Sequence, residues 1–186
     1  MNNQEYGQAI TAELTTVLRQ ISLEQAEALI ELIADSAAVF IAGAGRSGYM
    51  SRAFCMRLMH LGLTTYMVGD TTTPAIQAND LLIVCSGSGE TKSLVSNANK
   101  AKELGAKVAL ITINDESTIA KLADAIVKIN AVSPKADKEG NTRSIQPMAN
   151  LFEQCLLLFL DILAIMLMDR KGKTAQEMFT LHANLE

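Results

Sequence analysis

Residues 39–48 read VFIAGAGRSG, an apolar run that leads into glycines at positions 43, 45 and 48. A short apolar run that is rich in β-branched and aromatic residues and closed by glycine is typical of a buried strand. The Gly-x-Gly-x-x-Gly spacing is that of a dinucleotide-binding loop, and Asp70 lies roughly where an acid would contact the ribose. Taken alone, the stretch predicts a strand that turns tightly into a helix, and it leaves open whether a dinucleotide or another ligand binds there.

Four more short apolar runs follow and alternate with helical patterns. The runs are TTYMVG (64–69), DLLIVCSG (80–87), KVALITIN (107–114) and AIVKI (125–129), and the helical patterns lie at about 46–61, 90–104 and 117–123. Continuous apolar strands that alternate with helices indicate a parallel sheet covered on both faces. We therefore predict an α/β fold, a doubly wound five-stranded parallel sheet flanked by helices in a flavodoxin-like three-layer sandwich. Its ligands are expected at the carboxyl ends of the strands.

The length of 186 residues suits a single domain, which we expect to span residues 1–186. Helical patterns at about 4–35 precede the first strand. In this region Ser22 is placed to cap the second helix, with Gln25 as its reciprocal partner in a capping box. The hydrophobic fraction of 49% is high for a small monomer. We therefore expect the N-terminal helices to contribute to oligomerisation.

A second helical region at about 147–182 closes the chain and is expected to share in oligomerisation. Its first helix should run from about 147 to 169, with a proline in the first turn. The run 148–168 is long enough to raise the question of a membrane span. Because Glu153 and Asp161 interrupt it, we interpret the run as a core or interface helix.

Composition excludes several classes of protein. A net charge of −4 argues against a nucleic-acid-binding surface, which needs clustered basic residues. The three cysteines are far apart and the N-terminus lacks a signal-peptide pattern, so we expect a reduced, cytoplasmic protein that contacts neither nucleic acid nor membrane. The two histidines are too dispersed for a metal site, and no metal is expected.

A second glycine-rich loop, CSGSGET at residues 85–91, follows the third strand and enters a helix. Hydroxyl groups and exposed amides at a helix N-terminus form a site for an anion such as a phosphate monoester. The candidate binding residues are Ser86, Gly87, Ser88, Gly89 and Thr91. No lysine comes directly after either glycine, which excludes a nucleoside-triphosphate loop. An ordinary strand-to-helix turn is the alternative, but both glycine-rich loops should open on the same edge of the sheet.

The pair GAGRSG and SGSGET resembles the sugar isomerase (SIS) domain, in which the serine-rich loop holds a sugar phosphate. The blocks RLMHLG, VGD, SIQPMANLFEQCLLLFLD and HANLE extend the resemblance to the 6-phospho-3-hexuloisomerase family, from residue 39 onward. The resemblance implies isomerisation of D-arabino-hex-3-ulose 6-phosphate to fructose 6-phosphate, the step after formaldehyde fixation in the ribulose monophosphate pathway. It also implies a homotetramer with sites near subunit interfaces, and no metal or nucleotide cofactor.

Moving a carbonyl between neighbouring carbons passes through an enediolate, which requires a base and a group that stabilises a negative oxygen. Glu153 is the candidate base, because it occupies the position of the family's LFEQ glutamate; an acid that caps or pairs at a helix start is the alternative. Arg46 is the candidate cation for substrate oxygens or the enediolate, or it forms an ion pair with Asp70 or a neighbouring subunit. Ser47 is a candidate contact to phosphate or hydroxyl groups.

The two histidines lead to different expectations. His182 lies in the closing HANLE, where resemblance to related isomerases suggests a proton shuttle or opening of the sugar ring, supplied across an interface. Packing of the tail on a neighbour is the alternative. His60 ends the helix after GAGRSG and is interpreted as a histidine favoured by the helix dipole, with a catalytic role in reserve. Which of the two opens the ring is left open.

Two further questions concern the loop at 130–146 and rival functions. The loop is polar and charged, and it is either solvated or a lid over the substrate. Rival functions are another SIS isomerase, acting on arabinose 5-phosphate or sedoheptulose 7-phosphate, and a non-catalytic sugar-phosphate sensor. A sensor should carry a basic helix-turn-helix segment, and the longer arabinose 5-phosphate isomerases should carry an extension after the SIS domain. The chain shows neither, which favours the free-standing enzyme.

Overall fold

The computed structural model describes residues 1–132 and 144–185. The described elements are α1 (Asn3–Leu18), α2 (Leu23–Asp35), β1 (Val39–Gly43), α3 (Gly45–His60), β2 (Thr65–Met67), β3 (Leu81–Cys85), α4 (Lys92–Glu103), β4 (Lys107–Thr112), the 3₁₀ turn η1 (Ala120–Leu122), β5 (Ala125–Lys128), α5 (Asn150–Arg170) and α6 (Ala175–Phe179). Each of the five apolar runs contains a strand, as predicted. Most of the polar loop that we considered as a lid lies outside the described residues.

The five strands form one parallel sheet in the order β2-β1-β3-β4-β5. In this register Ile41 of β1 lies between Met67 of β2 and Ile83 of β3. The predicted doubly wound sheet is therefore confirmed. After β1 the chain first adds β2 on one side and then returns to add β3 on the other, so the order reverses between β1 and β3. The loops that follow these two strands flank the crevice where such sheets bind ligands.

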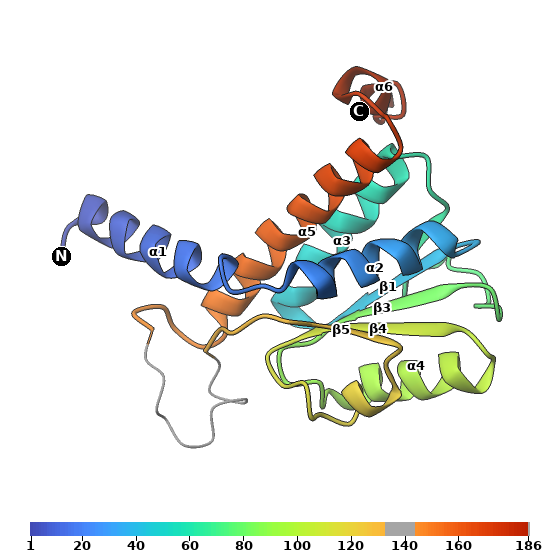
Figure 1. Cartoon of the computed structure of the whole chain (residues 1–186), viewed down its shortest axis with the longest axis horizontal. Helices are drawn as coiled ribbons and strands as arrows, with labels where there is room; N and C mark the ends of the chain where they lie inside the picture. The colour runs from blue at the N-terminus through green and yellow to red at the C-terminus, as the bar shows by residue number, and fades with distance from the viewer. Residues whose placement is uncertain (133–143, 186) are drawn as a thin grey trace.

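Helices cover both faces of the sheet (Figure 1), and successive strand residues face opposite layers. Ile41 and Ile83 belong to the larger core, which includes residues of α2, α3 and α5. Phe40 and Leu82 belong to a smaller core with α4 and η1. The continuous apolar runs in the sequence follow directly from this burial on both faces.

Helix α5 is the central helix of the larger layer. Its buried residues recur at helical spacing: Leu151, Phe152, Cys155, Leu156, Phe159, Leu160, Leu163, Ala164 and Leu167. By length and composition alone α5 could span a membrane, but half of its most apolar window is buried inside the protein. Contacts with α1, α2 and α3 account for its apolar composition. The interpretation as a core helix is confirmed.

Two local expectations about helix starts are wrong in part. Helix α5 begins at Asn150 rather than in the turn of Pro147, because Met148 has a φ of 57°, a left-handed conformation that a right-handed helix cannot include. Ser22 caps α2 by accepting from the backbone amide of Gln25 (3.3 Å). The Gln25 side chain does not complete a capping box; its Oε1 accepts from the backbone amide of Lys128 (3.0 Å) and ties α2 to β5.

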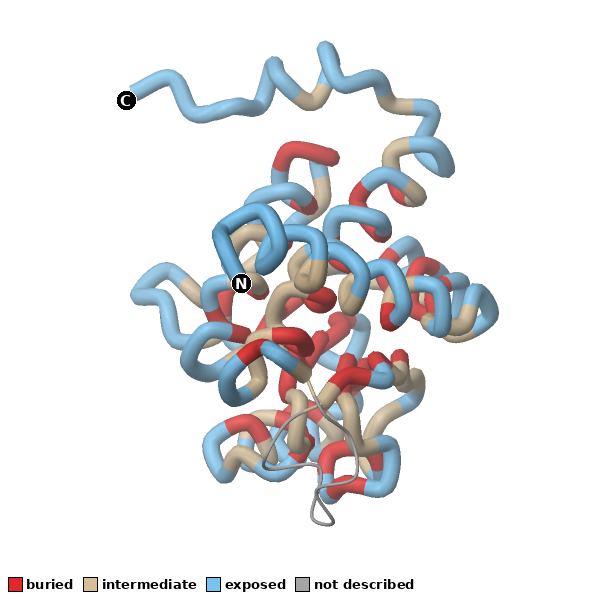
Figure 2. Tube along the Cα trace, turned by 90° about the vertical axis from the view of Figure 1, so that its left-hand side faces the viewer, coloured by how far each residue is buried: buried red, intermediate tan, exposed pale blue. Residues whose placement is uncertain are grey.

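The two ends of the chain extend from the body. Helix α1 projects away from the sheet, and α6 lies beyond the far end of α5 (Figure 1). Val17 is the buried residue of α1, and the segment after α5 is exposed along most of its length (Figure 2). On α5 itself Leu158, Ile162 and Ile165 are exposed, at 38%, 41% and 56%. This spacing places three apolar side chains on one outer face of the helix.

Candidate active site

A pocket of about 550 Å³ lies at the carboxyl ends of β1 and β3. Three segments form its walls: the loop after β1, the loop after β3, and the start of α5 with the residues before it. The lining residues are Ala44, Gly45, Arg46, Ser47, Cys85, Ser86, Gly87, Ser88, Thr91, Leu94, Pro147, Met148, Ala149, Phe152 and Glu153. The topology therefore brings together both glycine-rich loops and the glutamate that the sequence singled out.

The first loop owes its glycines to packing and turn geometry. Gly45 has a φ of 58°, which favours glycine. A Cβ on Gly43 would lie 2.5 Å from Ser51 Oγ, and one on Gly48 would lie 2.8 Å from the carbonyl oxygen of Gly43. Two glycines therefore let the start of α3 pack directly against β1. The N-cap residue Ala44 contributes no side-chain hydrogen bond, which leaves the first amides of α3 without a side-chain cap.

The second loop is held in shape by its own hydrogen bonds. Ser86 Oγ accepts from the backbone amide of Gly89 (3.1 Å), and Ser88 Oγ accepts from that of Glu90 (3.3 Å). The Glu90 carboxylate in turn accepts from the amide of Thr118 (2.7 Å). A Cβ on Gly87 would lie 3.2 Å from the ring of Phe152, so this loop packs closely on α5. These contacts hold the loop against α5 and against the segment around Thr118.

Most of the predicted binding residues line the pocket. Ser47, Ser86, Gly87, Ser88 and Thr91 do so, whereas Gly89 does not. Gly89 is buried, and its φ of 63° lets the chain turn at this position. Its amide is bonded to Ser86 and faces the loop itself. In this structure Gly89 therefore shapes the loop, and the other five residues offer hydroxyls and backbone groups to a ligand.

Arg46 and Glu153 form an ion pair in the wall of the pocket. Arg46 Nη1 lies 3.3 Å from Glu153 Oε2, and the Glu153 side chain is 15% exposed. Arg46 also donates to Oδ1 of Asn150, which lies one turn before Glu153 on α5. Asp70 pairs with Arg52 (2.8 Å) instead, so the alternative of an Arg46–Asp70 ion pair is wrong. A cation and a carboxylate thus stand together beside the two loops.

The histidines lie far from this pocket within one chain. His60 is buried at the end of α3 and stacks on His182, with ring centroids 5.5 Å apart. Helix α3 has 16 residues, so it is about 24 Å long and separates this pair from Arg46. Burial and the positive charge of Arg57 lower the pKa of His60. These two effects oppose the charged form of His60, which the end of a helix favours, so the dipole interpretation stays a prediction.

The remaining candidates for chemistry are weaker. Burial raises the pKa of Cys85 and of Cys155 to about 11, so neither thiol provides a ready thiolate at neutral pH. Among residues 1–132 and 144–185, no group of three or more histidine, cysteine and carboxylate side chains could hold a metal ion.

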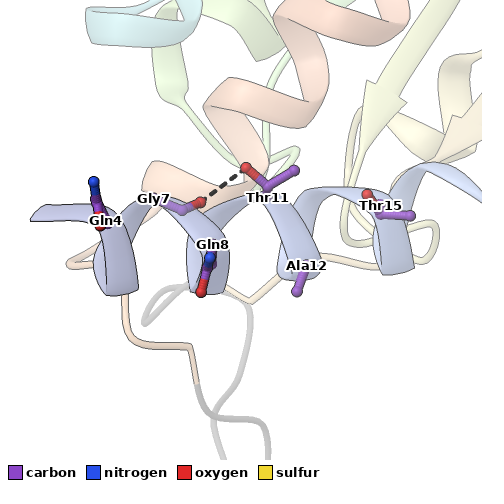
Figure 3. A pocket seen from close by; sticks show the side chains of 6 residues that line it. All are labelled: Gln4, Gly7, Gln8, Thr11, Ala12 and Thr15. Carbon is purple, nitrogen blue, oxygen red and sulfur yellow. Dashed lines mark hydrogen bonds between the residues drawn. The ribbon is translucent and has the colours of Figure 1, made fainter.

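A broad hollow along α1 is lined by Gln4, Gly7, Gln8, Thr11, Ala12 and Thr15 (Figure 3). It offers no titratable side chain, and Thr11 donates to the carbonyl of Gly7 (2.8 Å).

The pocket combines the groups that a sugar-phosphate isomerase needs. Backbone amides and hydroxyls suit a phosphate, a carboxylate can move a proton between carbons, and a guanidinium can stabilise a negative oxygen. Sequence reasoning missed Asn150 and Phe152. The spacing of Asn150, three residues before Glu153, could have placed it on the same face of the helix. The contact of Phe152 with Gly87 depends on tertiary packing alone.

Comparison with known proteins identifies the family. The SIS domain pattern matches residues 32–158. The 3-hexulose-6-phosphate isomerase of Bacillus subtilis is 49% identical over the whole length of both chains. That of Mycobacterium gastri is 45% identical over 94% of this chain and 86% of the relative. A solved Methanococcus jannaschii protein with an inferred 3-hexulose-6-phosphate isomerase function aligns with a TM-score of 0.84 at 33% identity, over 98% of this chain and 99% of that protein. The chain therefore belongs to the SIS domain family.

Proposed function

We propose that this protein is a 3-hexulose-6-phosphate isomerase, which converts D-arabino-hex-3-ulose 6-phosphate to fructose 6-phosphate. The observation that carries the proposal is the pairing of Glu153 with Arg46 (3.3 Å) in a pocket whose opposite wall is the serine-rich loop. The named relatives, which align along nearly the whole chain, support the choice of substrate. The residues of the pocket and the names of the relatives therefore support the same class of reaction, the isomerisation of a sugar phosphate.

The reaction needs two proton transfers on carbon. The phosphate binds to the amides and hydroxyls of the two loops, which include Ser47, Ser86, Ser88 and Thr91. The Glu153 carboxylate takes the proton from C2, and the electron pair of that C–H bond forms the C2–C3 double bond while the C3 carbonyl becomes an enediolate oxygen. Arg46 stabilises this negative oxygen. A proton then moves from the C2 hydroxyl to the oxygen on C3, Glu153 returns its proton to C3, and the carbonyl remains at C2.

We further propose that the protein is a homotetramer with sites near the subunit interfaces. The exposed apolar face of α5 formed by Leu158, Ile162 and Ile165 supports an assembly that covers it. The projecting α1 and the exposed C-terminal segment are the N- and C-terminal regions that we expect to take part. In such an assembly His182 and the His60 ring on which it stacks would lie beside the pocket of a neighbouring subunit, where one of them would open the furanose ring.

The cellular setting follows from the substrate. We place the enzyme in the cytoplasm, in the ribulose monophosphate pathway, where its substrate is formed from formaldehyde and ribulose 5-phosphate. The three cysteines are free thiols in the structure, which is the state expected in a reducing compartment. A lid function of the loop at 130–146 remains a proposal that rests on its polar sequence.

A coupled assay tests the proposed function. Hex-3-ulose 6-phosphate is made in situ from formaldehyde and ribulose 5-phosphate, and formation of fructose 6-phosphate is followed. We expect rapid formation with the wild-type protein and none above background with Glu153→Gln. Arabinose 5-phosphate and sedoheptulose 7-phosphate serve as rival substrates under the same conditions. Faster turnover of either rival, or no fructose 6-phosphate from the hexulose, would refute the assignment.

A further inference from the structure

A continuous series of hydrogen bonds links α1 to Arg46 in the pocket. The Glu13 carboxylate accepts from the side-chain amide of Gln146 (3.0 Å). Gln146 Oε1 accepts from the side-chain amide of Asn150 (2.9 Å). Asn150 Oδ1 accepts from Arg46, whose guanidinium also contacts Glu153 (3.3 Å). We call the series Glu13–Gln146–Asn150–Arg46 the relay. It connects α1 to the cation of the site through two residues that lie more than a hundred positions further along the sequence.

The chemistry of its two ends determines the direction of the relay. An ionised carboxylate only accepts hydrogen bonds, and a guanidinium only donates them. With Glu13 at one end, Gln146 must turn its NH₂ group toward α1 and its oxygen toward Asn150. Asn150 must then turn its NH₂ toward Gln146 and its oxygen toward Arg46. Each amide therefore has one productive orientation, and the oxygen that holds Arg46 depends on the charge of Glu13.

Glu13 also anchors the segment that precedes α5. Its carboxylate accepts from the Ser144 hydroxyl (2.7 Å) and from the backbone amide of Ile145 (2.9 Å). Partial burial acts to raise the pKa of Glu13, but these hydrogen bonds and that of Gln146 outweigh it and hold the pKa below its ordinary value. The acceptor is therefore ionised at neutral pH.

The anchored segment carries a strained residue in the wall of the pocket. Met148 has a φ of 57° and is 81% exposed, yet it lines the pocket between Gln146 and Asn150. A left-handed conformation is unfavourable for a residue with a Cβ, so it persists only where its surroundings hold it. Gln146 is 7% exposed and bonded at both ends of its amide. The relay residues thus hold the strained turn on both sides.

We propose that Glu13 is a positioning residue for the isomerisation, which acts through Gln146 and Asn150 to hold the Arg46 guanidinium beside Glu153. The inference rests on the proposed function. Arg46 has a 54% exposed side chain, and a long exposed arginine samples many rotamers unless it is held. By donating to Asn150, it is fixed where a negative oxygen would form next to the base. Because that oxygen forms only in the transition state, the relay should affect kcat and leave KM nearly unchanged.

An exchange of side chains tests the direction of the relay. The variants are Glu13→Gln, Gln146→Glu and the double variant that carries both. Glu13→Gln removes the charge that orients the two amides, and Gln146→Glu places two carboxylates against each other. The double variant restores one amide and one carboxylate, and the new carboxylate at 146 again accepts from Asn150. Glu27→Gln, on the exposed surface of α2, is the matched control.

We expect each single variant to lower kcat about tenfold with KM within about twofold of wild type, and the double variant to recover most of kcat. Melting temperatures check that the variants are folded at the assay temperature. Wild-type kcat in both single variants would overturn the proposal. So would a double variant no better than the worse single variant, or losses that only track the unfolded fraction.

A second measurement does not depend on activity. The order of the Arg46 side chain is read from ¹⁵N relaxation of its Nε–H group, assigned with Arg46→Lys. We expect a rigid Arg46 in the wild type and in the Glu27→Gln control, and a mobile one in Glu13→Gln. An equally rigid Arg46 in Glu13→Gln would overturn the proposal. If the wild type shows no isomerase activity, the proposed function fails while this measurement still decides whether the relay orders Arg46.

Discussion

The three glycines of GAGRSG should respond differently to alanine, because each is required for a different physical reason. An alanine Cβ at Gly48 would lie 2.8 Å from the backbone oxygen of Gly43, and backbone cannot move as a flexible side chain can. Overpacking of this kind costs about 1–3 kcal/mol. At Gly45 an added Cβ meets nothing within 4 Å, and the cost comes from a φ of 58° alone. That strain is worth about 1–2 kcal/mol.

The assay is thermal unfolding followed by circular dichroism at fixed protein concentration, together with kcat. For a chain of this length, 1 kcal/mol moves Tm by about 2–4 °C. We expect Gly45→Ala to lower Tm by about 2–8 °C. For Gly48→Ala we expect a fall of about 2–12 °C and, in addition, a loss of kcat, because the start of α3 that carries Arg46 must shift.

Alanine at Gly43 provides a comparison in which the nearest obstacle is a side chain and not backbone. There the added Cβ would meet the Ser51 hydroxyl at 2.5 Å, so Ser51→Ala should relieve part of the damage in a double variant. No such rescue is expected for Gly48, since the obstacle is backbone. A neutral Gly48→Ala variant, or rescue of Gly48→Ala by Ser51→Ala, would refute the packing account of this loop.

Further predictions concern the base, the tail and acid stability. Glu153→Gln should lower kcat by at least about a hundredfold, because the proton carrier is lost, while isothermal titration still detects fructose 6-phosphate. His182→Ala should lose activity, and mixing it with Glu153→Gln subunits should restore part of it if pockets are shared between subunits. At Asp124, partial burial raises the pKa, but hydrogen bonds that include those from Lys102 and Lys107 outweigh it and lower the pKa below 3.8. The stability from this ionised group is therefore fully present above its unfolded pKa and is lost as the pH falls below about 3.8 toward the folded value. Urea unfolding should therefore give Asp124→Asn a lower free energy of unfolding than the wild type at neutral pH, and this difference should shrink in the acidic range.

Each of these predictions has a contradicting result. Substantial residual turnover in Glu153→Gln would remove it as the base. Wild-type activity in His182→Ala would leave the histidine with a packing role on His60. If the difference in free energy of unfolding between the wild type and Asp124→Asn stayed constant from neutral pH to pH 3, packing and not the charge would supply the stability.

Local patterns in the sequence were sufficient for the fold. Burial on both faces makes each strand a continuous apolar run, and glycines mark the turns that follow β1 and β3, so residues 39–48 and 85–91 could be placed at one sheet edge. The same patterns identified α5 as a core helix. The strands, the turns and this helix depend on residues close together in the chain, where spacing alone carries the information. Glu153 was singled out by the resemblance to the family's LFEQ block.

Contacts between distant segments could not be predicted in this way. Arg46 pairs with Asn150 and Glu153 rather than with Asp70, and Gln25 reaches Lys128 instead of its own helix start. His60 and His182 stack at the far end of α3, away from the pocket within one chain.

The glycines at 43 and 48 have the spacing of a dinucleotide-binding loop, but they serve the close packing of α3 on β1. A side chain with several possible partners selects among them only when packing brings one within hydrogen-bond distance. The positions of α1, α3 and α5 around the sheet therefore determine which residues act together.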